Sequence, residues 1–442
     1  MSYQAAIDQL SAMAPELYAR PDLPRPKFSL DEIGILLGAL GNPQRGFRSV
    51  LIAGTNGKGS TAATLASILM AAGVRAGLYT SPHLARVNER IRVGETDTTD
   101  DEFARLYFKV HDVAQELVQS SRLRQLPSFF EILTAQALLH FAESGVEFAV
   151  LEVGMGGRLD ATNIVDPLLS IITDISLDHM EWLGSTIAAI TREKAGILRP
   201  GGTLITLPQH PEANHALGEV AMELGVHAVS ATAWMPPLTV KLGAPYSVEA
   251  LGQALVVDSP LAGAHQHRNI ALAIAAAVEL ALTHHLPITP AAIASGIRQT
   301  RWPGRMERFL ANGMEWLLDV AHNPAGAWAL RAGLTGILER EKPKTLIFSC
   351  LRDKPIREMA QILFPLFDRV IFAPIHSARA ASIEDLQAAA RSTGTTAVSA
   401  SSVRQAIEIA GEVGDVGAVV ISGSVYLVGE VRSVLLGGVP KP

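Results

Sequence analysis

The sequence predicts an α/β protein in which a doubly wound, mostly parallel β-sheet domain precedes a smaller α/β domain. Short apolar runs alternate with helix-forming runs through most of residues 1–298, and the same alternation resumes after a break near residues 299–303. Strands that are apolar throughout are typical of parallel sheets covered by helices on both faces. With 442 residues the chain is too long for one core, because single cores stop growing at about 250–300 residues. We therefore expect two domains, residues 1–298 and 304–442.

The first predicted strand, residues 50–53, is followed by the glycine-rich turn Gly54-Thr55-Asn56-Gly57-Lys58-Gly59-Ser60 and by a predicted helix over residues 61–72. Glycines let backbone N–H groups face one point, and a helix N-terminus adds partial positive charge there, so this turn is expected to hold phosphate. Lys58 would neutralise the β- and γ-phosphates, and the Ser60 hydroxyl could ligate Mg²⁺. The spacing G-x-x-G-K-x-S departs from the common G-x-x-x-x-G-K-[ST] form. A turn without a ligand is the alternative, but Lys58 and Ser60 favour a P-loop that binds a nucleoside triphosphate.

The remaining elements follow the same alternation. In the first domain we expect strands at residues 148–153 and 168–173, helices at 131–144, 185–196 and 269–286, and a β-hairpin within 238–257. In the second domain, strands at 316–320, 345–351, 369–373 and 417–422 alternate with helices and indicate a Rossmann-like α/β unit. Ligands of such sheets bind at the carboxyl ends of the strands.

Two polar residues of the first domain lie at such strand ends. Glu152, followed at once by glycines, is placed where P-loop proteins hold Mg²⁺. A buried, hydrogen-bonded structural acid is the alternative. His179 follows the apolar stretch 173–177, which we expect to be a further strand. Alone it would more often be a loop residue, but beside Glu152 and the P-loop a ligand role is favoured.

Lys194 lies near the end of a predicted helix, in Arg192-Glu193-Lys194-Ala195-Gly196-Ile197. Such a lysine is ordinarily solvated or ion-paired. A desolvated lysine has a lowered pKa, however, and its neutral amine can capture CO₂ as an anionic carbamate.

In the second domain, Asp319 and His322 end a strand that would face an interdomain cleft, where a site is expected. The following Asn-Pro makes a purely structural turn an alternative. Arg301 and Arg305 either reach phosphate from the domain boundary or are surface charges.

Composition excludes several classes of protein. Hydrophobic residues make up 48% and charged residues 18% of the chain, which fits a globular protein and not a disordered one. The net charge of −6 and the lack of a basic block give no reason to expect nucleic acid as a partner. The one cysteine, Cys350, lies in an apolar stretch and fits a packed strand residue in a reducing compartment. No signal peptide or membrane-spanning run is evident. We expect a soluble cytoplasmic protein, most simply a monomer, whose partners are small molecules.

The motifs together resemble those of the folylpolyglutamate synthase/dihydrofolate synthase family within the Mur ligase superfamily. The resemblance covers nearly the whole chain and is weakest over residues 204–257 and 393–417. Mur ligases of peptidoglycan synthesis share the phosphate-binding loop but lack the segments 128–131 and 151–163 in this form. The matching segments are GTNGKGS (54–60), TSPHL (80–84), NERI (88–91), SFFE (128–131), LEVGMGGRLDATN (151–163), SLDH (176–179), REKAGI (192–197), HQ..N (265–269), PGR (303–305), LDVAHNP (318–324) and SGSVYLVGEV (422–431).

The resemblance implies an enzyme that uses ATP and Mg²⁺ to join L-glutamate to a pterin-bearing carboxylate through an acyl phosphate. It also implies a role for each residue that matches a family motif. ATP would be bound by Thr55, Asn56, Gly57, Lys58, Gly59, Ser60, Asn269, Arg305 and Asp319. One Mg²⁺ would be held by Ser60, Ser81 and Glu152, and a second by His179 and a carboxylated Lys194. His322 would lie near the transferred phosphate or the incoming glutamate. The pteroate pocket would be lined by Ser128, Phe129, Phe130, Glu131, Leu159, Asp160 and Ala161.

Other functions remain open at this point. A P-loop switch ATPase or a kinase would use the same phosphate-binding loop, but would not need a second domain with the segment DVAHNP. Within the family, SFFE resembles the dihydropteroate-binding segment of enzymes that make dihydrofolate as well as polyglutamate tails. We therefore expect a bifunctional enzyme. An enzyme that only extends polyglutamate tails and a Mur-type amino-acid ligase are the alternatives.

Overall fold

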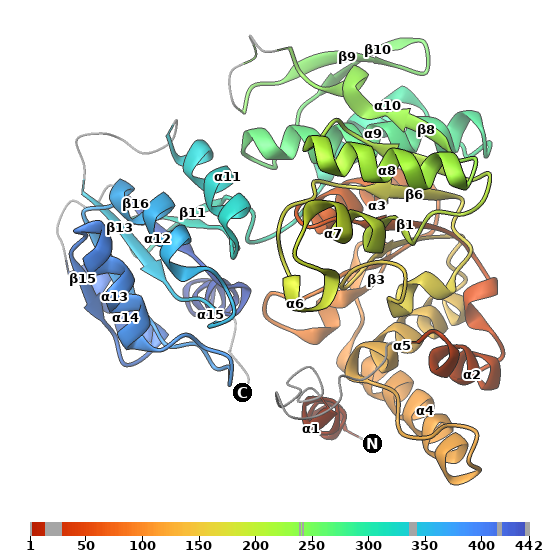
Figure 1. Ribbon diagram of the computed structural model, residues 1–442, viewed down its shortest axis with the longest axis horizontal. Coiled ribbons are helices and arrows are strands. Elements are labelled where there is room, and N and C mark those ends of the chain that lie inside the picture. The colour runs from red at the N-terminus through yellow and green to blue at the C-terminus, as the bar shows by residue number, and fades with distance from the viewer. Residues whose placement is uncertain are drawn as a thin grey trace.

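The described residues form two β-sheets with helices on both faces, and a separate β-hairpin (Figure 1). The computed structural model describes residues 2–13, 29–237, 240, 243–335, 343–412 and 418–437. The first sheet has the order β4-β3-β2-β5-β1-β6-β7-β8. Its strands are β1 (Arg48–Ala53), β2 (Ala76–Tyr79), β3 (Ile91–Val93), β4 (Thr96–Asp97), β5 (Phe148–Glu152), β6 (Leu169–Ile172), β7 (Thr203–Thr206) and β8 (His227–Ser230).

The central strand β1 shows how the sequence sets the layers around this sheet. Val50 and Ile52 belong to the core that contains α3, α9 and α10, whereas Leu51 and Ala53 belong to the core on the opposite face. Five of the strand's six residues are buried, as expected for a strand covered on both sides. The helices of this part are α1 (Tyr3–Met13), α2 (Asp31–Ala39), α3 (Lys58–Ala71), α4 (Asp100–Gln119), α5 (Phe129–Glu143), α6 (Met180–Leu183), α7 (Ile187–Ala195), α8 (Pro211–Glu223), α9 (Ala264–Leu282) and α10 (Pro290–Gln299).

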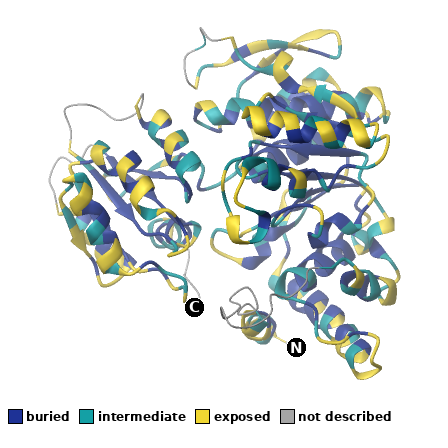
Figure 2. Cartoon of the chain, in the orientation of Figure 1, coloured by how far each residue is buried: buried dark blue, intermediate teal, exposed yellow. Residues whose placement is uncertain are grey.

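The second sheet has the order β11-β12-β16-β13-β14-β15 and is also mostly parallel. Its strands are β11 (Glu307–Ala311), β12 (Met314–Leu318), β13 (Lys344–Phe348), β14 (Arg369–Phe372), β15 (Ala397–Ser399) and β16 (Ala418–Ser422). One face is covered by α11 (Pro324–Leu334), α12 (Ile356–Leu363) and α13 (Ile383–Thr393), the other by α14 (Val403–Gly411) and α15 (Val425–Leu435). In both parts the central strands are buried and the outer helix faces are exposed (Figure 2). The doubly wound, mostly parallel α/β fold is thereby confirmed.

Several predicted elements begin or end elsewhere. Helix α3 begins at Lys58, three residues before the prediction, because Gly57 adopts a left-handed conformation (φ 91°) that starts the helix. Helix α9 begins at Ala264 and not at Asn269. The predicted strand at 173–177 is wrong: β6 ends at Ile172, and the chain then bends so that Asp174 pairs with Asn56.

The predicted hairpin is formed by β9 (Tyr246–Ala250) and β10 (Gln253–Val257). Residues 238, 239, 241 and 242 of that prediction, and residue 417 of the last predicted strand, lie outside the described residues. Short 3₁₀ turns occur at Pro43–Arg45, Val87–Arg90, Ala161–Ile164, Ala231–Trp234 and Phe364–Leu366. Among the described helices, none is long and apolar enough to cross a membrane.

The two sheets are joined by the connector 300–306 between α10 and β11, and they also touch elsewhere. Gly429 of α15 packs against the loop that follows β2: a Cβ built on Gly429 would lie 1.8 Å from the carbonyl oxygen of Leu84. Only glycine permits this approach. The contact places the second sheet next to the loop that carries Ser81.

Candidate active site

The glycine-rich turn between β1 and α3 forms a concave loop at the carboxyl edge of the first sheet. The N–H groups of Thr55 and Asn56 donate to the carbonyl oxygen of Asp174 at 2.8 and 3.1 Å, so they hold the loop in place. Lys58 folds back over the loop, its Nζ 3.2 Å from the carbonyl oxygens of Gly54 and Thr55. Ser60 lies in the first turn of α3 and is buried. The helix N-terminus and Lys58 therefore both supply positive charge to one place.

A partly exposed ion pair supports this loop, and sequence reasoning missed it. Arg268 of α9 makes a bidentate contact with Asp174, with distances of 2.6 to 2.9 Å. Asn269, the next residue, is buried and lies against the loop: a Cβ on Gly57 would be 2.2 Å from its Oδ1. The predicted nucleotide residue Asn269 is thus brought to the loop by α9. The sequence did hint at a role for Arg268, since it directly precedes the predicted site residue Asn269 in the segment HQHRN (265–269).

Glu152 is brought to the same edge by β5. It is 4% exposed, and its Oε2 accepts a hydrogen bond of 3.1 Å from the backbone N–H of Ser81. A Cβ built on Gly59 would be 3.2 Å from that Oε2, so Glu152 lies beside the first turn of α3. Burial raises the pKa of Glu152, against the opposing effect of Lys58.

These neighbours fit a magnesium ion. The carboxylate of Glu152 and the hydroxyls of Ser60 and Ser81 are hard oxygen ligands, and Mg²⁺ is often bound through one or two carboxylates, with phosphates and water completing the octahedron. Within the described ranges, no three His, Cys, Asp or Glu side chains gather closely enough to hold a metal by themselves. Any ion here would therefore depend on hydroxyls, water and phosphate.

Lys194 is buried at the end of α7, and its Nζ donates to the carbonyl oxygen of Gly54 at 2.7 Å. Burial, followed by repulsion from Lys58, lowers the pKa of Lys194 to about 7. His179 begins α6 with a left-handed backbone (φ 50°), and burial lowers its pKa to about 4. Both side chains are thus neutral over part of the physiological pH range, as a metal-ligating imidazole and a CO₂-accepting amine must be.

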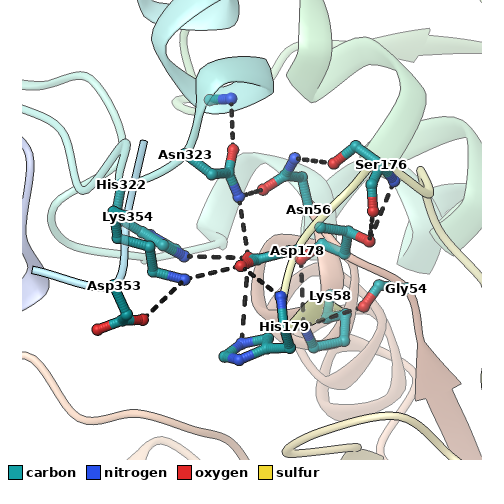
Figure 3. A network of polar contacts seen from close by, with 12 residues as sticks. Gly54, Asn56, Lys58, Ser176, Asp178, His179, His322, Asn323, Asp353 and Lys354 are labelled. Carbon is teal, nitrogen blue, oxygen red and sulfur yellow. Dashed lines mark hydrogen bonds and ion pairs between the residues drawn. The ribbon is translucent and has the colours of Figure 1, made fainter. Parts of the chain in front are cut away.

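A network of polar contacts joins the two parts of the molecule at Asp178 (Figure 3). Lys354, which follows β13, donates from Nζ to Oδ1 of Asp178 at 2.7 Å, and the two side chains are 6% and 10% exposed. Asn323 donates from Nδ2 to Oδ1 of Asn56 at 3.0 Å and to Oδ2 of Asp178 at 3.3 Å. The second sheet therefore contacts the phosphate-binding loop directly.

The charges around Asp178 oppose the effect of burial on its pKa. Burial alone would raise the pKa of this carboxyl, but His179, Lys354 and His322 together hold it below its usual range. Sequence reasoning missed the Asp178–Lys354 pair. Two features of the sequence could have pointed to this pair. Asp353 and Lys354 follow a predicted strand, and Asp178 precedes the predicted ligand His179.

His322 lies just past β12, and its Nδ1 is 2.9 Å from the carbonyl oxygen of Val320. Because a carbonyl oxygen only accepts, Nδ1 carries the proton and Nε2 is the basic atom of the neutral ring. That Nε2 is 4.0 Å from Oδ2 of Asp178. Burial lowers the pKa of His322, and the positive charge of Lys354 adds to this.

Arg305 and Asp319 approach from the connector and the end of β12. Asp319 is buried and accepts hydrogen bonds from the N–H groups of Met306 and Ala321 at 3.0 and 2.9 Å. Burial raises the pKa of Asp319 and lowers that of Arg305, and Arg305 is in turn influenced by the charges of Asp319 and Glu152. Arg305 therefore lies where it can face phosphate charge, whereas Arg301 is exposed.

The predicted pteroate residues lie at the N-terminus of α5 and in the loop after β5. Phe130 packs beside Tyr79, with ring centroids 6.0 Å apart, and the Arg90 guanidinium is 5.4 Å from the ring centroid of Phe129. Ser128 and Glu131 form a capping box that starts α5, with hydrogen bonds of 2.8 Å and 3.3 Å. The S-x-x-E spacing of Ser128 and Glu131 is the sequence pattern typical of such a capping box.

Asp160 has a local structural role. It is buried and accepts from the N–H groups of Met155 and Thr162 at 2.9 and 3.0 Å, and from the Thr162 hydroxyl at 2.6 Å. Leu159 is half-buried and Ala161 is buried beside it. A direct contact of Leu159, Asp160 or Ala161 with substrate stays a prediction.

The arrangement brings together the glycine-rich loop, the side-chain oxygens of Ser60, Ser81 and Glu152, and cationic or basic groups from the connector and the second sheet. Those groups are Arg305, His322 and Lys354. Such a site can hold a triphosphate and stabilise negative charge that develops during phosphoryl transfer. Since polar residues of both sheets meet, an acceptor group can be enclosed between them and kept from water.

Comparison with known proteins agrees with this geometry. Residues 52–277 match the family model described as the Mur ligase middle domain, and residues 304–425 match the Mur ligase, glutamate ligase domain. The chain is 34% identical to the folylpolyglutamate synthase of Lacticaseibacillus casei over 91% of this chain and 93% of that protein. It is also 34% identical to the dihydrofolate synthase/folylpolyglutamate synthase of Bacillus subtilis, over 90% and 92%. The structure of Mycobacterium tuberculosis folylpolyglutamate synthase complexed with ADP and AMPPCP is similar, with a TM-score of 0.87, 31% identity, and coverage of 99% of this chain and 100% of that one.

Proposed function

This chain belongs to the folylpolyglutamate synthase/dihydrofolate synthase family of Mur ligases, and from that premise we propose that it joins L-glutamate to a pterin-bearing carboxylate at the expense of ATP. The observation that carries the proposal is the meeting of both sheets at the phosphate-binding loop, where Asn323 bonds to Asn56. A ligase needs this arrangement because its acyl phosphate must be shielded from water until the amine arrives.

The reaction has two steps. The substrate carboxylate attacks the γ-phosphorus of ATP, the bond to the bridging oxygen breaks, and an acyl phosphate and ADP form. The amine of glutamate then attacks the acyl carbon, and inorganic phosphate leaves as the amide forms. The negative charge of the phosphates would be stabilised by Lys58, the N-terminus of α3 and Arg305. Other parts of the nucleotide would be bound by Asn269 and Asp319. A Mg²⁺ ion held by Ser60, Ser81 and Glu152 would neutralise phosphate charge when bound.

His322 is suited to the second step. The attacking amine must lose a proton, and Nε2 of a neutral imidazole can accept it. Burial keeps the pKa of His322 low, so the ring is neutral near pH 7. Asp178, at 4.0 Å from that nitrogen, would stabilise the ring once it is protonated.

We propose further that Lys194 is carboxylated and, with His179, holds a second Mg²⁺. Support comes from its burial, from a pKa lowered to about 7 and from its contact with Gly54. The neutral amine would bond to the carbon of CO₂ and lose one proton, giving an anionic carbamate. That carbamate supplies an oxygen ligand that an ammonium group lacks.

The pterin acceptor is proposed to be dihydropteroate as well as tetrahydrofolate and its polyglutamates. The flat faces of Phe129 and Phe130 at the start of α5 support a pterin-binding role. Two relatives with 34% identity carry the two kinds of name, one folylpolyglutamate synthase and one dihydrofolate synthase/folylpolyglutamate synthase. Substrate choice is therefore the question for experiment. We propose that the enzyme acts in the cytoplasm, where a free thiol such as the buried Cys350 stays reduced. We also propose that it is a monomer, which light scattering would test.

The test is phosphate release with ATP, Mg²⁺ and glutamate, comparing dihydropteroate with tetrahydrofolate. Release that requires both glutamate and a pterin carboxylate supports the ligase. Release without either would indicate a P-loop ATPase, and transfer of phosphate to a stable acceptor would indicate a kinase. Release with tetrahydrofolate but not dihydropteroate would overturn bifunctionality alone.

A further inference from the structure

Trp302, in the connector between α10 and β11, packs against the phosphate-binding loop. A Cβ built on Gly59 would lie 2.7 Å from Cζ2 and 3.1 Å from Cε2 of the indole. The same point is 3.2 Å from Oε2 of Glu152. The Trp302 ring and the Glu152 carboxylate therefore both face the space that a side chain of Gly59 would occupy, and they leave no room for one.

The position of the ring is set by packing. The indole N–H is buried and has no hydrogen-bond partner in the part of the chain that the structure describes, although buried tryptophan N–H groups usually find one. The ring instead rests on the core that contains α3, α9 and α10. Trp302 thus fixes Gly59 by its shape and not by a polar bond.

We propose that Trp302 is a positioning residue for the metal–nucleotide site: its ring packs on the first turn of α3 beside Glu152 and holds that turn in place, so that the Ser60 hydroxyl and the Glu152 carboxylate can bind one Mg²⁺. The inference rests on the proposed ATP-dependent function. It also gives a reason for the glycine between Lys58 and Ser60 in G-x-x-G-K-x-S, since any Cβ there would meet the indole. Because Trp302 belongs to the interdomain connector, the arrangement of the two sheets acts on the ion site through this ring.

The experiment measures ADP binding by calorimetry with Mg²⁺ and with a chelator, in the full-length protein. Trp302→Leu removes the flat ring, and we expect Mg²⁺-dependent ADP affinity to fall on the order of tenfold, as for other residues that orient metal ligands. ADP affinity with chelator and the KM for glutamate should change by less than about threefold, a margin well below the 10–100-fold loss typical of such residues. Trp302→Phe keeps a flat ring and should stay within the same margin of the parent.

A size exchange tests the contact itself. Gly59→Ala alone should lose Mg²⁺-dependent binding, and Gly59→Ala with Trp302→Leu should bind better than either single variant, because the methyl group fills part of the vacated space. A double variant no better than Gly59→Ala, or a Trp302→Phe variant as weak as Trp302→Leu, overturns the inference. Trp234→Leu is the control: Trp234 is equally half-buried against the same core, but its N–H donates to the Glu249 carbonyl at 3.0 Å.

Two outcomes separate this inference from the proposed function. A parent protein that binds no ADP and ligates no glutamate contradicts the function. A parent that binds and ligates, with variants that behave like it, contradicts only the role of Trp302. Thermal unfolding of each variant shows whether it is folded, and the size exchange remains informative if one single variant is unstable.

Discussion

Nζ of Lys194 donates a 2.7 Å hydrogen bond to the carbonyl oxygen of Gly54, which joins the end of α7 to the first residue of the phosphate-binding loop. The amine is buried, and its pKa is lowered to about 7 by that burial and by Lys58. In the described part of the chain its one hydrogen bond is to a carbonyl, and a lysine so placed beside a second lysine is poorly stabilised as a cation. The geometry therefore suits an amine that reacts.

Lys194→Ala is predicted to be inactive, and acetate is predicted to restore part of the activity by supplying the missing carboxylate. In the parent enzyme, activity that depends on added bicarbonate should rise as the pH increases through about 7, where Lys194 becomes neutral. Carbon NMR with labelled bicarbonate would detect the carbamate. Lys109→Ala is a control, since Lys109 is exposed and paired with Glu143. A Lys194→Ala variant with parental turnover would contradict the assignment.

Lys58→Ala is predicted to lower kcat about a hundredfold or more, as the loss of one preorganised charge contact to a transition state does. The fold should persist, because the hydrogen bonds of Lys58 are made to carbonyls of its own loop. Steady-state kinetics and circular dichroism check both expectations. Turnover near that of the parent would exclude the loop as the phosphate site.

Glu152→Gln keeps the size of the side chain and removes its charge. Activity should be lost at low Mg²⁺ and partly recovered at high Mg²⁺, because the hydroxyls of Ser60 and Ser81 remain. A titration of activity against Mg²⁺ gives the answer. Full activity at low Mg²⁺ would show that Glu152 is a structural acid.

Asp178→Asn removes the carboxylate nearest to the buried charge of Lys354 and leaves only the longer contact of 4.0 Å with Asp353 among the described residues. Unfolding stability should fall by about 3–5 kcal/mol, the usual cost of breaking a buried pair, and Asp178→Asn with Lys354→Met should be more stable than Asp178→Asn alone. Glu219→Gln breaks the exposed pair with Arg192 and should cost less than about 1 kcal/mol. Chemical denaturation compares the three. Equal losses for Asp178→Asn and Glu219→Gln would contradict the prediction.

The pH dependence of the same pair has a definite sign. The folded pKa of Asp178 is lowered, so its contribution to stability is complete above the unfolded value of about 3.9 and is lost as the pH falls below that value. The parent protein should therefore lose more stability on acidification than Asp178→Asn does.

Domain closure is predicted to require both nucleotide and folate. Solution scattering should show a smaller radius of gyration with an ATP analogue plus folate than without them, since a hinge at residues 299–303 would let the second sheet approach. Arg305→Ala should lower activity if its guanidinium binds the phosphates as proposed. An unchanged radius together with a fully active Arg305→Ala variant would confine the site to the first domain.

The sequence allowed the order of elements to be predicted, and also the edge of each sheet at which the candidate site residues gather, because apolar runs and glycine turns are local signals. The start of α3 was missed because Lys58-Gly59-Ser60 has no apolar periodicity, and Gly57 alone sets the helix start. The stretch after β6 was expected to be a strand from its apolar residues, but Asp174 leaves the sheet to bond the loop. Asp178 and Lys354 are 176 residues apart, and no local pattern joins residues at that separation.

The position of β16 has a consequence for how the protein is made. This strand is last in the chain, yet it lies between β12 and β13 in the middle of the second sheet. A nascent chain that has emerged only through β15 has two separate pieces of sheet with exposed edges and no strand to join them. We expect the second sheet, and with it the site residues Asp319 and His322, to become ordered only after residue 422 has left the ribosome. A chain that ends before β16 would then carry an intact phosphate-binding loop and no second half to close over it.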